Sequence, residues 1–259
     1  MSDELRIERR DDGWILWTLQ RPERKNALSR ALVDEMHHAL NDLKDDSSAR
    51  VLVLHGAGGS FCAGADLKER AAMSSREVVD FLDRLGACLD ALDRLPLPTI
   101  AALEGHVLGG GLELALACDF RIAAPGTRLG LPEVSLGILP GAGGTQRLSR
   151  IIGESWAKEW ILLAKVVDVV EASERGLLHR VAPSAEGLLA EVERFAQPLL
   201  QGAALAQREA LQAIDAAAGP LEQGLRQERE AYLRLLGSAD RLEALAAFAE
   251  KRAPRFRGR

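Results

Sequence analysis

The chain has 259 residues, of which 47% are hydrophobic and 27% are charged. These values are typical of a globular protein that buries its own core without disulfides or a structural metal. The 33 Lys and Arg residues against 38 Asp and Glu residues give a net charge of −5, which disfavours binding to nucleic acid or to anionic membranes. The three cysteines form no Cys-x-x-Cys pair, the first residues do not resemble a signal peptide, and no apolar run is long enough to span a bilayer. We therefore expect a soluble, cytoplasmic protein.

Short apolar runs alternate with amphipathic stretches in the first half of the chain. The runs at residues 14–19, 51–55 and 99–103 are typical of strands. Apolar residues recur at helical spacing after Ser29 and after Ser74, and serine is a good helix N-cap. Strand–helix–strand repetition predicts an α/β fold with mostly parallel strands joined by crossover helices.

The second half of the chain is predominantly helical. Helices are expected at residues 156–166, 186–200, 203–217, 221–236 and 241–251, separated by Gly, Pro or Ser. We expect a core at residues 1–193 that carries the functional site, followed by an all-helical region at 194–259. The Ala-rich helices of that region favour packing against another subunit, although helices that face solvent can have a similar composition.

Glycine clusters mark the segments where a ligand could meet exposed backbone. The chain has 24 glycines, and many of them cluster at residues 56–59, 64, 109–111 and 141–144, beside expected strands or helices. Backbone N–H groups at such places can bind a phosphate or an oxyanion, but tight turns and close packing also require glycine. No phosphate-binding or dinucleotide-binding glycine motif occurs in the required context, which disfavours nucleotide hydrolysis and nicotinamide chemistry.

Two glutamates lie beside these glycines. Glu113 falls in the first turn of a strongly apolar helix, where the helix dipole favours a carboxylate but burial would require a partner or a role. Glu133 follows Pro132, and this dipeptide could simply open a helix. Together, two half-buried carboxylates beside two glycine loops suit general acid–base catalysis at an activated carbonyl.

The other chemically active side chains are weaker candidates. The five histidines form no His-Glu-x-x-His motif and no metal-ligand spacing with cysteine, so we expect no metal site. His106 is expected to have a structural role. The chain lacks a Gly-x-Ser-x-Gly elbow, and Cys62 is interpreted as a small buried residue rather than a nucleophile.

Several motifs in a fixed order resemble the enoyl-CoA hydratase/isomerase (crotonase) superfamily. They are Phe-Cys-Ala-Gly-Ala-Asp-Leu-Lys-Glu-Arg at 61–70, Gly-His-Val-Leu-Gly-Gly-Gly-Leu-Glu-Leu at 105–114, Ala-Cys-Asp at 117–119, Leu-Pro-Glu at 131–133 and Pro-Gly-Ala-Gly-Gly-Thr-Gln-Arg at 140–147. Segments at 21–28 and 247–252 extend the match over nearly the whole chain. The resemblance implies a crotonase-type spiral of ββα units whose C-terminal helices trimerise, usually within a hexamer built as a dimer of trimers.

The resemblance also implies roles for single residues. Ala65 and Gly110 match the positions whose N–H groups form an oxyanion hole for the thioester oxygen. Glu113 and Glu133 match the two acid–base glutamates of hydratases, and Gly141 matches a residue whose N–H helps to hold the catalytic water. The CoA adenine and phosphates would be held by Arg24, Lys25, Ala63, Lys68 and, from a neighbouring subunit, Lys251. The expected ligand is an acyl-CoA thioester, and no separate cofactor is expected because CoA is part of the substrate.

Within the superfamily, the segments at 61–75, 109–119, 240–243 and 251–256 resemble methylglutaconyl-CoA hydratases. This implies interconversion of 3-methylglutaconyl-CoA and 3-hydroxy-3-methylglutaryl-CoA, in leucine degradation or, as a dehydration, in isovaleryl-CoA formation. Burial of the second carboxylate of this substrate would require a cation or hydroxyl donors. Tyr232, Lys68 and Arg70 are the candidates, although Tyr232 also fits a half-buried helix aromatic.

Three alternatives stay open at this point. A hydratase for unbranched short-chain enoyl-CoA esters would share both glutamates, whereas a crotonase-fold isomerase usually lacks one of them. The alternative of another class is a non-catalytic RNA-binding protein, because animal mitochondrial members of the subfamily bind AU-rich RNA through lysines on an early helix. The matching segment here, 33–46, keeps only Lys44 among acidic residues, so we expect no nucleic acid partner.

Overall fold

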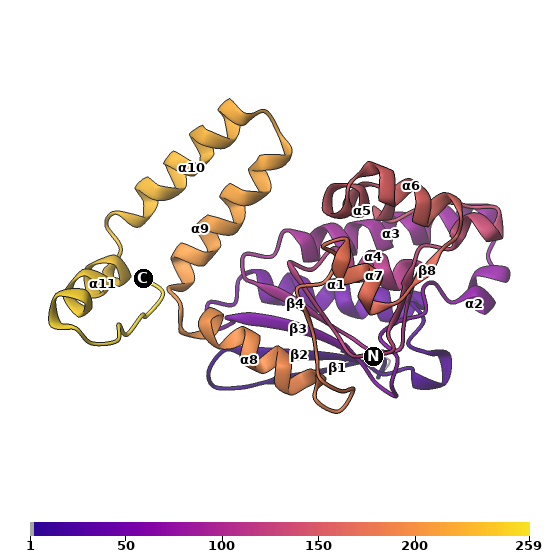
Figure 1. The fold of residues 1–259 in the computed structure, drawn as a ribbon, viewed down its shortest axis with the longest axis horizontal. Helices are drawn as coiled ribbons and strands as arrows, with labels where there is room; N and C mark the ends of the chain where they lie inside the picture. Colours follow the sequence, from indigo (N-terminus) through magenta and orange to yellow (C-terminus); the bar gives the residue numbers. More distant parts are fainter. Residues whose placement is uncertain (1–2) are drawn as a thin grey trace.

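The computed structural model describes residues 3–259 and has a body of two sheets with covering helices, from which an arm of helices projects (Figure 1). The main sheet has six strands in the order β1-β2-β3-β4-β6-β9. Its strands are β1 (Leu5–Arg9), β2 (Trp14–Leu19), β3 (Val51–Gly56), β4 (Thr99–Leu103), β6 (Phe120–Ala123) and β9 (Arg180–Val181). Only β1 and β2 pair in antiparallel fashion in this sheet, so the expected parallel α/β architecture and the three expected strands β2, β3 and β4 are confirmed.

Both faces of the main sheet are covered by helices. The helices α1 (Arg30–Lys44) and α3 (Ser75–Asp93) pack over one face, and α8 (Leu188–Gln201) packs under the other (Figure 1). Along β4, Ala101 and Leu103 point to the first face while Ile100 and Ala102 point to the second. Because both faces are buried, these strands are continuously apolar rather than alternating.

The two helices over the first face begin where their serines predict. Ser29 Oγ accepts the N–H of Leu32 at 3.0 Å and caps α1. Ser74 and Glu77 form a reciprocal capping box at the start of α3. Each cap satisfies backbone N–H groups that the first helical turn leaves unpaired.

A second, three-stranded sheet was not expected from the sequence. It consists of β5 (His106–Leu108), β7 (Arg128–Gly130) and β8 (Val166–Val167), in the order β5-β7-β8. The helix expected over 156–166 was wrong at its C-terminal end, because α6 spans Glu154–Leu162. The chain then turns through Ala164, which lies in the left-handed region at φ +48°. Val166 and Val167 are free to pair with β7 once the helix has ended.

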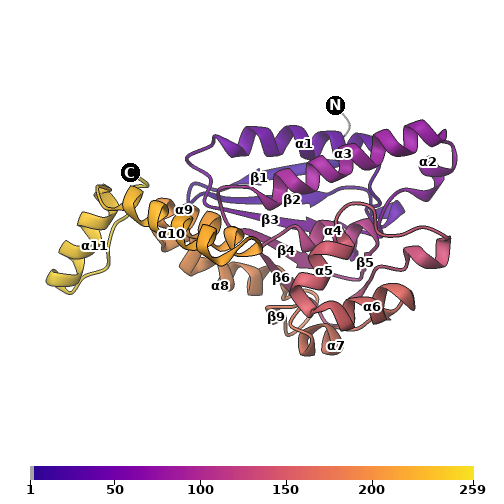
Figure 2. The same cartoon turned by 90° about the horizontal axis from the view of Figure 1, so that it is seen from above.

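Shorter helices connect these layers, and the arm follows α8. The connecting helices are α2 (Leu67–Ala71), α4 (Gly110–Leu116), α5 (Gly144–Ile152) and α7 (Val169–Glu174), with 3-10 turns η1 (Pro22–Arg24) and η2 (Glu133–Leu136). The arm consists of α9 (Ala204–Asp215), η3 (Ala216–Ala218), α10 (Leu221–Leu235) and α11 (Ala239–Glu250). It extends from the end of the body opposite α2 in both views (Figures 1 and 2).

The arm leaves many apolar side chains exposed. Leu221 is 77% exposed and Phe248 is 86% exposed, and six further large apolar residues of the arm exceed 45% exposure: Ile214, Leu225, Tyr232, Leu233, Leu242 and Leu245. The boundary expected between residues 193 and 194 falls inside α8, whose Val192 and Ala196 are buried against the sheet. The partition at this position stays a prediction. Within residues 3–259, no helix is long and apolar enough to cross a membrane.

Candidate active site

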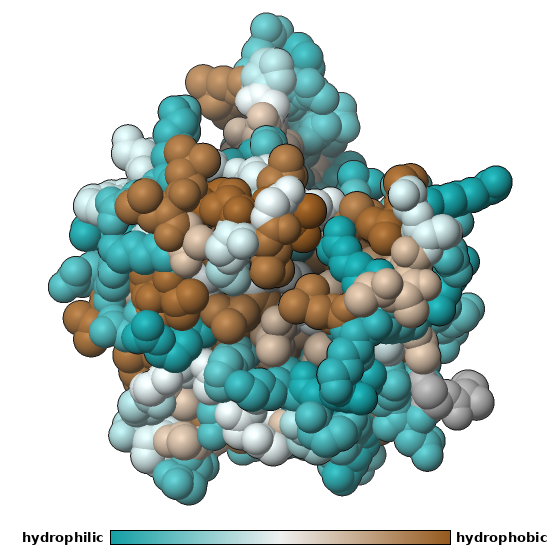
Figure 3. Space-filling model, turned by 90° about the vertical axis from the view of Figure 1, so that its right-hand side faces the viewer, coloured by the Kyte–Doolittle hydropathy of each residue, from teal (hydrophilic) through white to brown (hydrophobic). Residues whose placement is uncertain are grey.

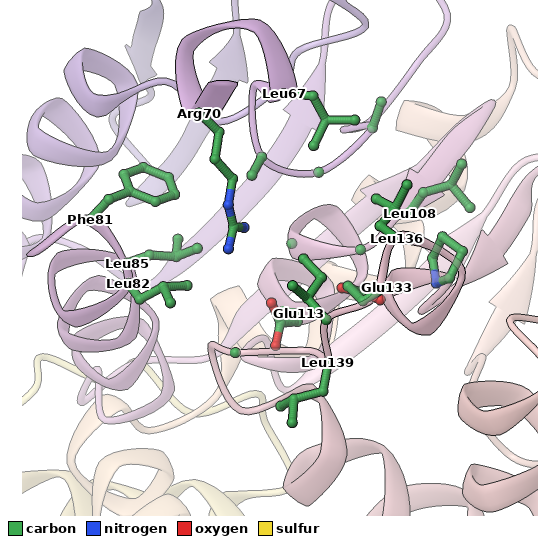
Figure 4. A pocket seen from close by; sticks show the side chains of 18 residues that line it. Leu67, Arg70, Phe81, Leu82, Leu85, Leu108, Glu113, Glu133, Leu136 and Leu139 are labelled. Carbon is green, nitrogen blue, oxygen red and sulfur yellow. The ribbon is translucent and has the colours of Figure 1, made fainter. Parts of the chain in front are cut away.

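A cavity of about 450 Å³ opens beside α4, between α2, α3 and the loops that follow β7 (Figure 4). Seven of the residues predicted to act at the site line it: Ala63, Ala65, Arg70, Gly110, Glu113, Glu133 and Gly141. The rest of the lining is largely apolar and includes Phe81, Leu82 and Leu85 of α3. The structure therefore brings the two glutamates and the two proposed oxyanion positions to one chamber.

Glu113 lies in the first turn of α4 and is 3% exposed. Its Oε1 accepts the backbone N–H groups of Ala142 and Gly144, both at 2.8 Å. Burial raises the pKa of Glu113, while these two N–H groups and the nearby positive charge of Arg147 oppose that rise. A Cβ on Gly144 would lie 3.0 Å from Glu113 Oε1, so the loop can approach this carboxylate closely only with glycine at that position.

Glu133 begins the 3-10 turn η2 and is also buried. Burial raises its pKa to about 7; its own backbone N–H and Arg70 oppose the rise, and the charge of Glu113 adds to it. Oε2 of Glu133 has no hydrogen-bond partner among residues 3–259, although it is buried. Gly109, at φ +53°, leaves room for this side chain, because a Cβ there would lie 3.1 Å from Glu133 Oε1.

Two backbone N–H groups beside the glutamates have no backbone acceptor within the described chain. Leu28 donates its N–H to Gly64 O at 2.8 Å and accepts that of Asp66 at 3.0 Å, so the N–H of Ala65 points away from Leu28. Gly110 is the first residue of α4, where the N–H groups have no acceptor within the helix. An ideal Cβ on Gly110 would lie 3.6 Å from Ala65 N, which places the two donors side by side. Such a pair can stabilise an oxyanion.

The family model for enoyl-CoA hydratase/isomerase matches residues 9–259. The chain belongs to the enoyl-CoA hydratase/isomerase family. Its fold is accordingly of the crotonase type, as the sequence motifs predicted, and it is an enzyme whose family acts on CoA thioesters.

Individual members of the family are similar over nearly the whole chain. The enoyl-CoA isomerase/hydratase fer4 of Mycosarcoma maydis is 47% identical over 251 residues, covering 93% of this chain and 91% of that protein. The mitochondrial methylglutaconyl-CoA hydratase of Homo sapiens is 44% identical over 265 residues, covering 99% of this chain and 78% of that protein. The crystal structure of an enoyl-CoA hydratase from Bacillus anthracis superposes with a TM-score of 0.97 at 40% identity, covering 99% of this chain and all of that one.

Of the residues that the family resemblance assigns to CoA, Arg24, Lys25 and Ala63 lie close together, and Lys68 lies on α2. Lys25 Nζ is 3.1 Å from Nε2 of His106, and the N–H of Ala63 donates to Lys25 O at 3.0 Å. Arg24 is exposed on η1 next to them, and Lys68 is exposed on α2. His106, for which only a structural role was expected, therefore joins this basic group at the edge of the cavity that Ala63 lines.

Besides Arg24, Lys25 and Lys68, two further predicted site residues do not line the cavity. Tyr232 is 64% exposed on α10, beside a separate hollow between α9, α10 and α11. Lys251 follows α11 and is exposed. Both lie on the arm, away from α4 (Figure 1). They can act at an active site only if the arm of one subunit reaches another subunit, and that part stays a prediction.

Sequence reasoning missed Arg147, which supports the loop around Glu113. Its guanidinium donates to Ala142 O at 3.1 Å and contacts Asp90 at 2.8 Å and Asp93 at 3.2 Å on α3. This side chain therefore anchors the segment that supplies the N–H groups to Glu113. Its only sequence signal was its place at the end of the motif at 140–147. The interpretation of Cys62 is confirmed, since burial raises the pKa of its thiol to about 12.

The mouth of the cavity is apolar. Leu67, Leu136 and Leu139 line it and are each more than half exposed. Hydrophobic side chains gather around a hollow on the side of the body that carries α2 (Figure 3). An acyl-CoA could cover these side chains when it enters.

Proposed function

We propose that the protein is a hydratase that interconverts 3-methylglutaconyl-CoA and 3-hydroxy-3-methylglutaryl-CoA by syn addition or elimination of water. The observation that carries the proposal is that Glu113, Glu133 and the guanidinium of Arg70 share one cavity. The two carboxylates suit hydration, and the cation suits a substrate with a second carboxylate. The similarity to the human methylglutaconyl-CoA hydratase supports the same reading.

The thioester oxygen is bound between the N–H groups of Ala65 and Gly110. As water adds to Cβ, negative charge develops on this oxygen, and both donors are already oriented toward it. Removal of one oxyanion-hole donor costs about 3–4 kcal/mol of activation free energy in a comparable site. Backbone dipoles thus polarise the carbonyl in this mechanism.

The two glutamates share one proton, and one of them accepts a proton while the other donates one. Two N–H bonds to Oε1 favour the ionised form of Glu113, whereas burial and the charge of Glu113 favour the protonated form of Glu133. Glu113 therefore takes a proton from the attacking water, which the N–H of Gly141 helps to hold. Glu133 gives its proton to Cα, and a proton returned from Glu113 to Glu133 restores the starting state.

The ends of the substrate are held by charged and polar groups. Arg24, Lys25, Ala63 and Lys68, with Lys251 of a neighbouring subunit, bind the CoA portion. Arg70, which lines the cavity, meets the distal carboxylate of the acyl group together with Tyr232 of a neighbouring subunit. Subunits associate through the arm as a trimer, or as a hexamer built from two trimers.

A hydratase for unbranched short-chain enoyl-CoA is the second candidate, because Phe81, Leu82 and Leu85 make the chamber largely apolar. Product analysis tests the first candidate, hydration of 3-methylglutaconyl-CoA. Purified protein is incubated with 3-methylglutaconyl-CoA, and loss of the conjugated thioester absorbance is followed together with the mass of the product. Formation of 3-hydroxy-3-methylglutaryl-CoA by the wild type, and its loss in Glu133→Gln, is the expected result. Hydration of crotonyl-CoA without turnover of 3-methylglutaconyl-CoA would favour the second candidate.

A further inference from the structure

Arg70 differs from two arginines that pair with acidic residues at α2, because its guanidinium has no partner among the described residues. Arg21 pairs with Asp66 at 2.9 Å, and Arg30 pairs with Glu69 at 2.8 Å. Within residues 3–259, by contrast, the guanidinium of Arg70 makes neither an ion pair nor a hydrogen bond. An arginine that is partly removed from water without a partner is a site that an anionic ligand can complete.

The side chain of Arg70 points into the active-site chamber. It extends from α2 into the space between Phe81 and Leu85 on one side and the two glutamates on the other (Figure 4). Among the described residues, Arg70 is the only Lys or Arg that lines this cavity. A ligand whose thioester lies at Ala65 and Gly110 therefore meets one cation, in otherwise apolar surroundings.

Arg70 also acts on Glu133. Its positive charge lowers the pKa of Glu133, against the burial and the charge of Glu113 that raise it. Among the described residues that line the cavity with Glu133, the charged ones are Glu113 from α4 and Arg70 from α2, while α3 contributes the apolar side chains Phe81, Leu82 and Leu85. A change in the charge at Arg70 changes how firmly Glu133 holds its proton.

We propose that Arg70 selects acyl groups that end in an anion, and that pairing with this anion keeps Glu133 in its proton-donating form. This inference rests on the proposed function, because it concerns the substrate of the same site. An unpaired Arg70 favours loss of the proton from Glu133. A carboxylate at the far end of the acyl chain neutralises that field, so Glu133 stays protonated up to a higher pH. A neutral acyl chain leaves Arg70 unpaired, so the positive charge of Arg70 still favours loss of the proton from Glu133.

Binding of saturated acyl-CoA thioesters tests the selection without turnover. Glutaryl-CoA and pentanoyl-CoA have acyl chains of five carbons, and only the first ends in a carboxylate. By titration calorimetry we expect glutaryl-CoA to bind wild type about 10–100-fold more tightly, the range of a hydrogen bond to a charged group. Arg70→Gln should lose this preference, and Arg70→Lys should keep part of it. Arg76→Gln, which removes an exposed charge of α3 that does not line the cavity, should keep all of it.

The pH dependence of turnover tests the link to Glu133. With crotonyl-CoA, the alkaline fall of kcat/KM should move to higher pH in Arg70→Gln, because a cation that lowers the pKa of the proton donor has been removed. In the wild type, the alkaline fall of kcat should occur at higher pH with 3-methylglutaconyl-CoA than with crotonyl-CoA. A purely structural role of Arg70 would leave both profiles in place.

The outcomes separate this inference from the proposed reaction. Equal binding of glutaryl-CoA and pentanoyl-CoA, or an equal loss of both in Arg70→Gln, would overturn anion selection and indicate that Arg70 holds the CoA portion. Unmoved pH profiles would overturn the link to Glu133. Selection of glutaryl-CoA through Arg70, together with no hydration of 3-methylglutaconyl-CoA, would overturn the proposed reaction and leave anion selection in place.

Discussion

Glu113 Oε1 lies 2.8 Å from the backbone nitrogen of Gly144, the first residue of α5, and accepts its N–H. The N–H of Ala142 reaches the same oxygen at the same distance. One carboxylate oxygen is therefore occupied by the backbone of the loop at 140–144, which fixes the orientation of Glu113 across the cavity from Glu133.

A side chain at position 144 should displace Glu113. In Gly144→Ala the new Cβ would lie 3.0 Å from both Oε1 and Cγ of Glu113 and 2.9 Å from Cβ of Pro140, so the loop or the carboxylate must shift. We expect kcat to fall by about 10-fold or more, since small misplacements of catalytic groups are costly. Gly86→Ala is the matched control, because a Cβ at Gly86 meets nothing within 4 Å and should leave kcat unchanged. Equal rates in the two variants would show that the fit at Gly144 does not matter.

If Glu113 and Glu133 act as proposed, removal of either carboxylate should abolish most of the activity. Glu113→Gln and Glu133→Gln should each lower the rate of hydration by at least about 100-fold, the scale of general acid–base contributions. The fold and the binding of a saturated acyl-CoA should stay largely intact, which circular dichroism and calorimetry can check. Glu174→Gln, on the exposed surface of α7, serves as the control. If a variant keeps more than about a third of wild-type kcat, the substituted glutamate does not act as a general acid or base.

The raised pKa of Glu133 predicts a pH effect on stability. Its ordinary value is 4.5 and its folded value is about 7, so the folded state binds this proton more tightly than the unfolded chain does. The resulting stabilisation is complete below pH 4.5 and is lost as the pH rises through 7. As the pH rises from 4.5 to 7, the melting temperature of the wild type should therefore fall relative to that of Glu133→Gln. A constant difference in melting temperature from pH 4 to pH 8 would contradict the assignment.

The exposed apolar surface of the arm predicts association. Leu221, Leu225 and Phe248 leave a larger exposed apolar surface on the arm than a monomeric protein usually has. Size-exclusion chromatography with light scattering should give the mass of a trimer or a hexamer. A monomer at micromolar concentration would leave this surface, and any role of Lys251 at a neighbouring site, without support.

The role of Tyr232 depends on that assembly. If its hydroxyl reaches the distal carboxylate in a neighbouring subunit, Tyr232→Phe should lower kcat/KM for 3-methylglutaconyl-CoA by about 10–100-fold. Crotonyl-CoA has no such carboxylate, so its kcat/KM should not change. Equal effects on both substrates, or no effect on either, would mean that Tyr232 does not determine specificity.

Local sequence signals predicted the parts of the fold that depend on local chemistry. Ser29 and Ser74 cap helices wherever the following residues can form one, and the apolar run after Gly110 places Glu113 in a first turn. The short strand at Val166 could not be predicted, because two residues carry no periodicity and their state is set by pairing with Gly130. The same holds for Arg147, whose partners Asp90 and Asp93 lie more than fifty residues away in sequence.

The motifs also predicted which residues the structure brings together at one cavity, but not which cation lines it. Ala65, Gly110, Glu113, Glu133 and Gly141 all belong to recognisable motifs, and the structure places them around one cavity. Among the candidate cations, Lys68 and Arg70 belong to the same short helix, and the sequence could not show which one faces inward. Only the tertiary structure shows Arg70 in the cavity and Tyr232 on the arm.

The most direct test of the proposed function is the ratio of kcat/KM for 3-methylglutaconyl-CoA to that for crotonyl-CoA, measured with both substrates competing in one reaction. Pairing of the distal carboxylate with Arg70 predicts a ratio of about 10 or more for the wild type, from the free energy of one hydrogen bond to a charged group. A ratio of one or less would contradict the assignment and indicate a hydratase for unbranched short-chain substrates.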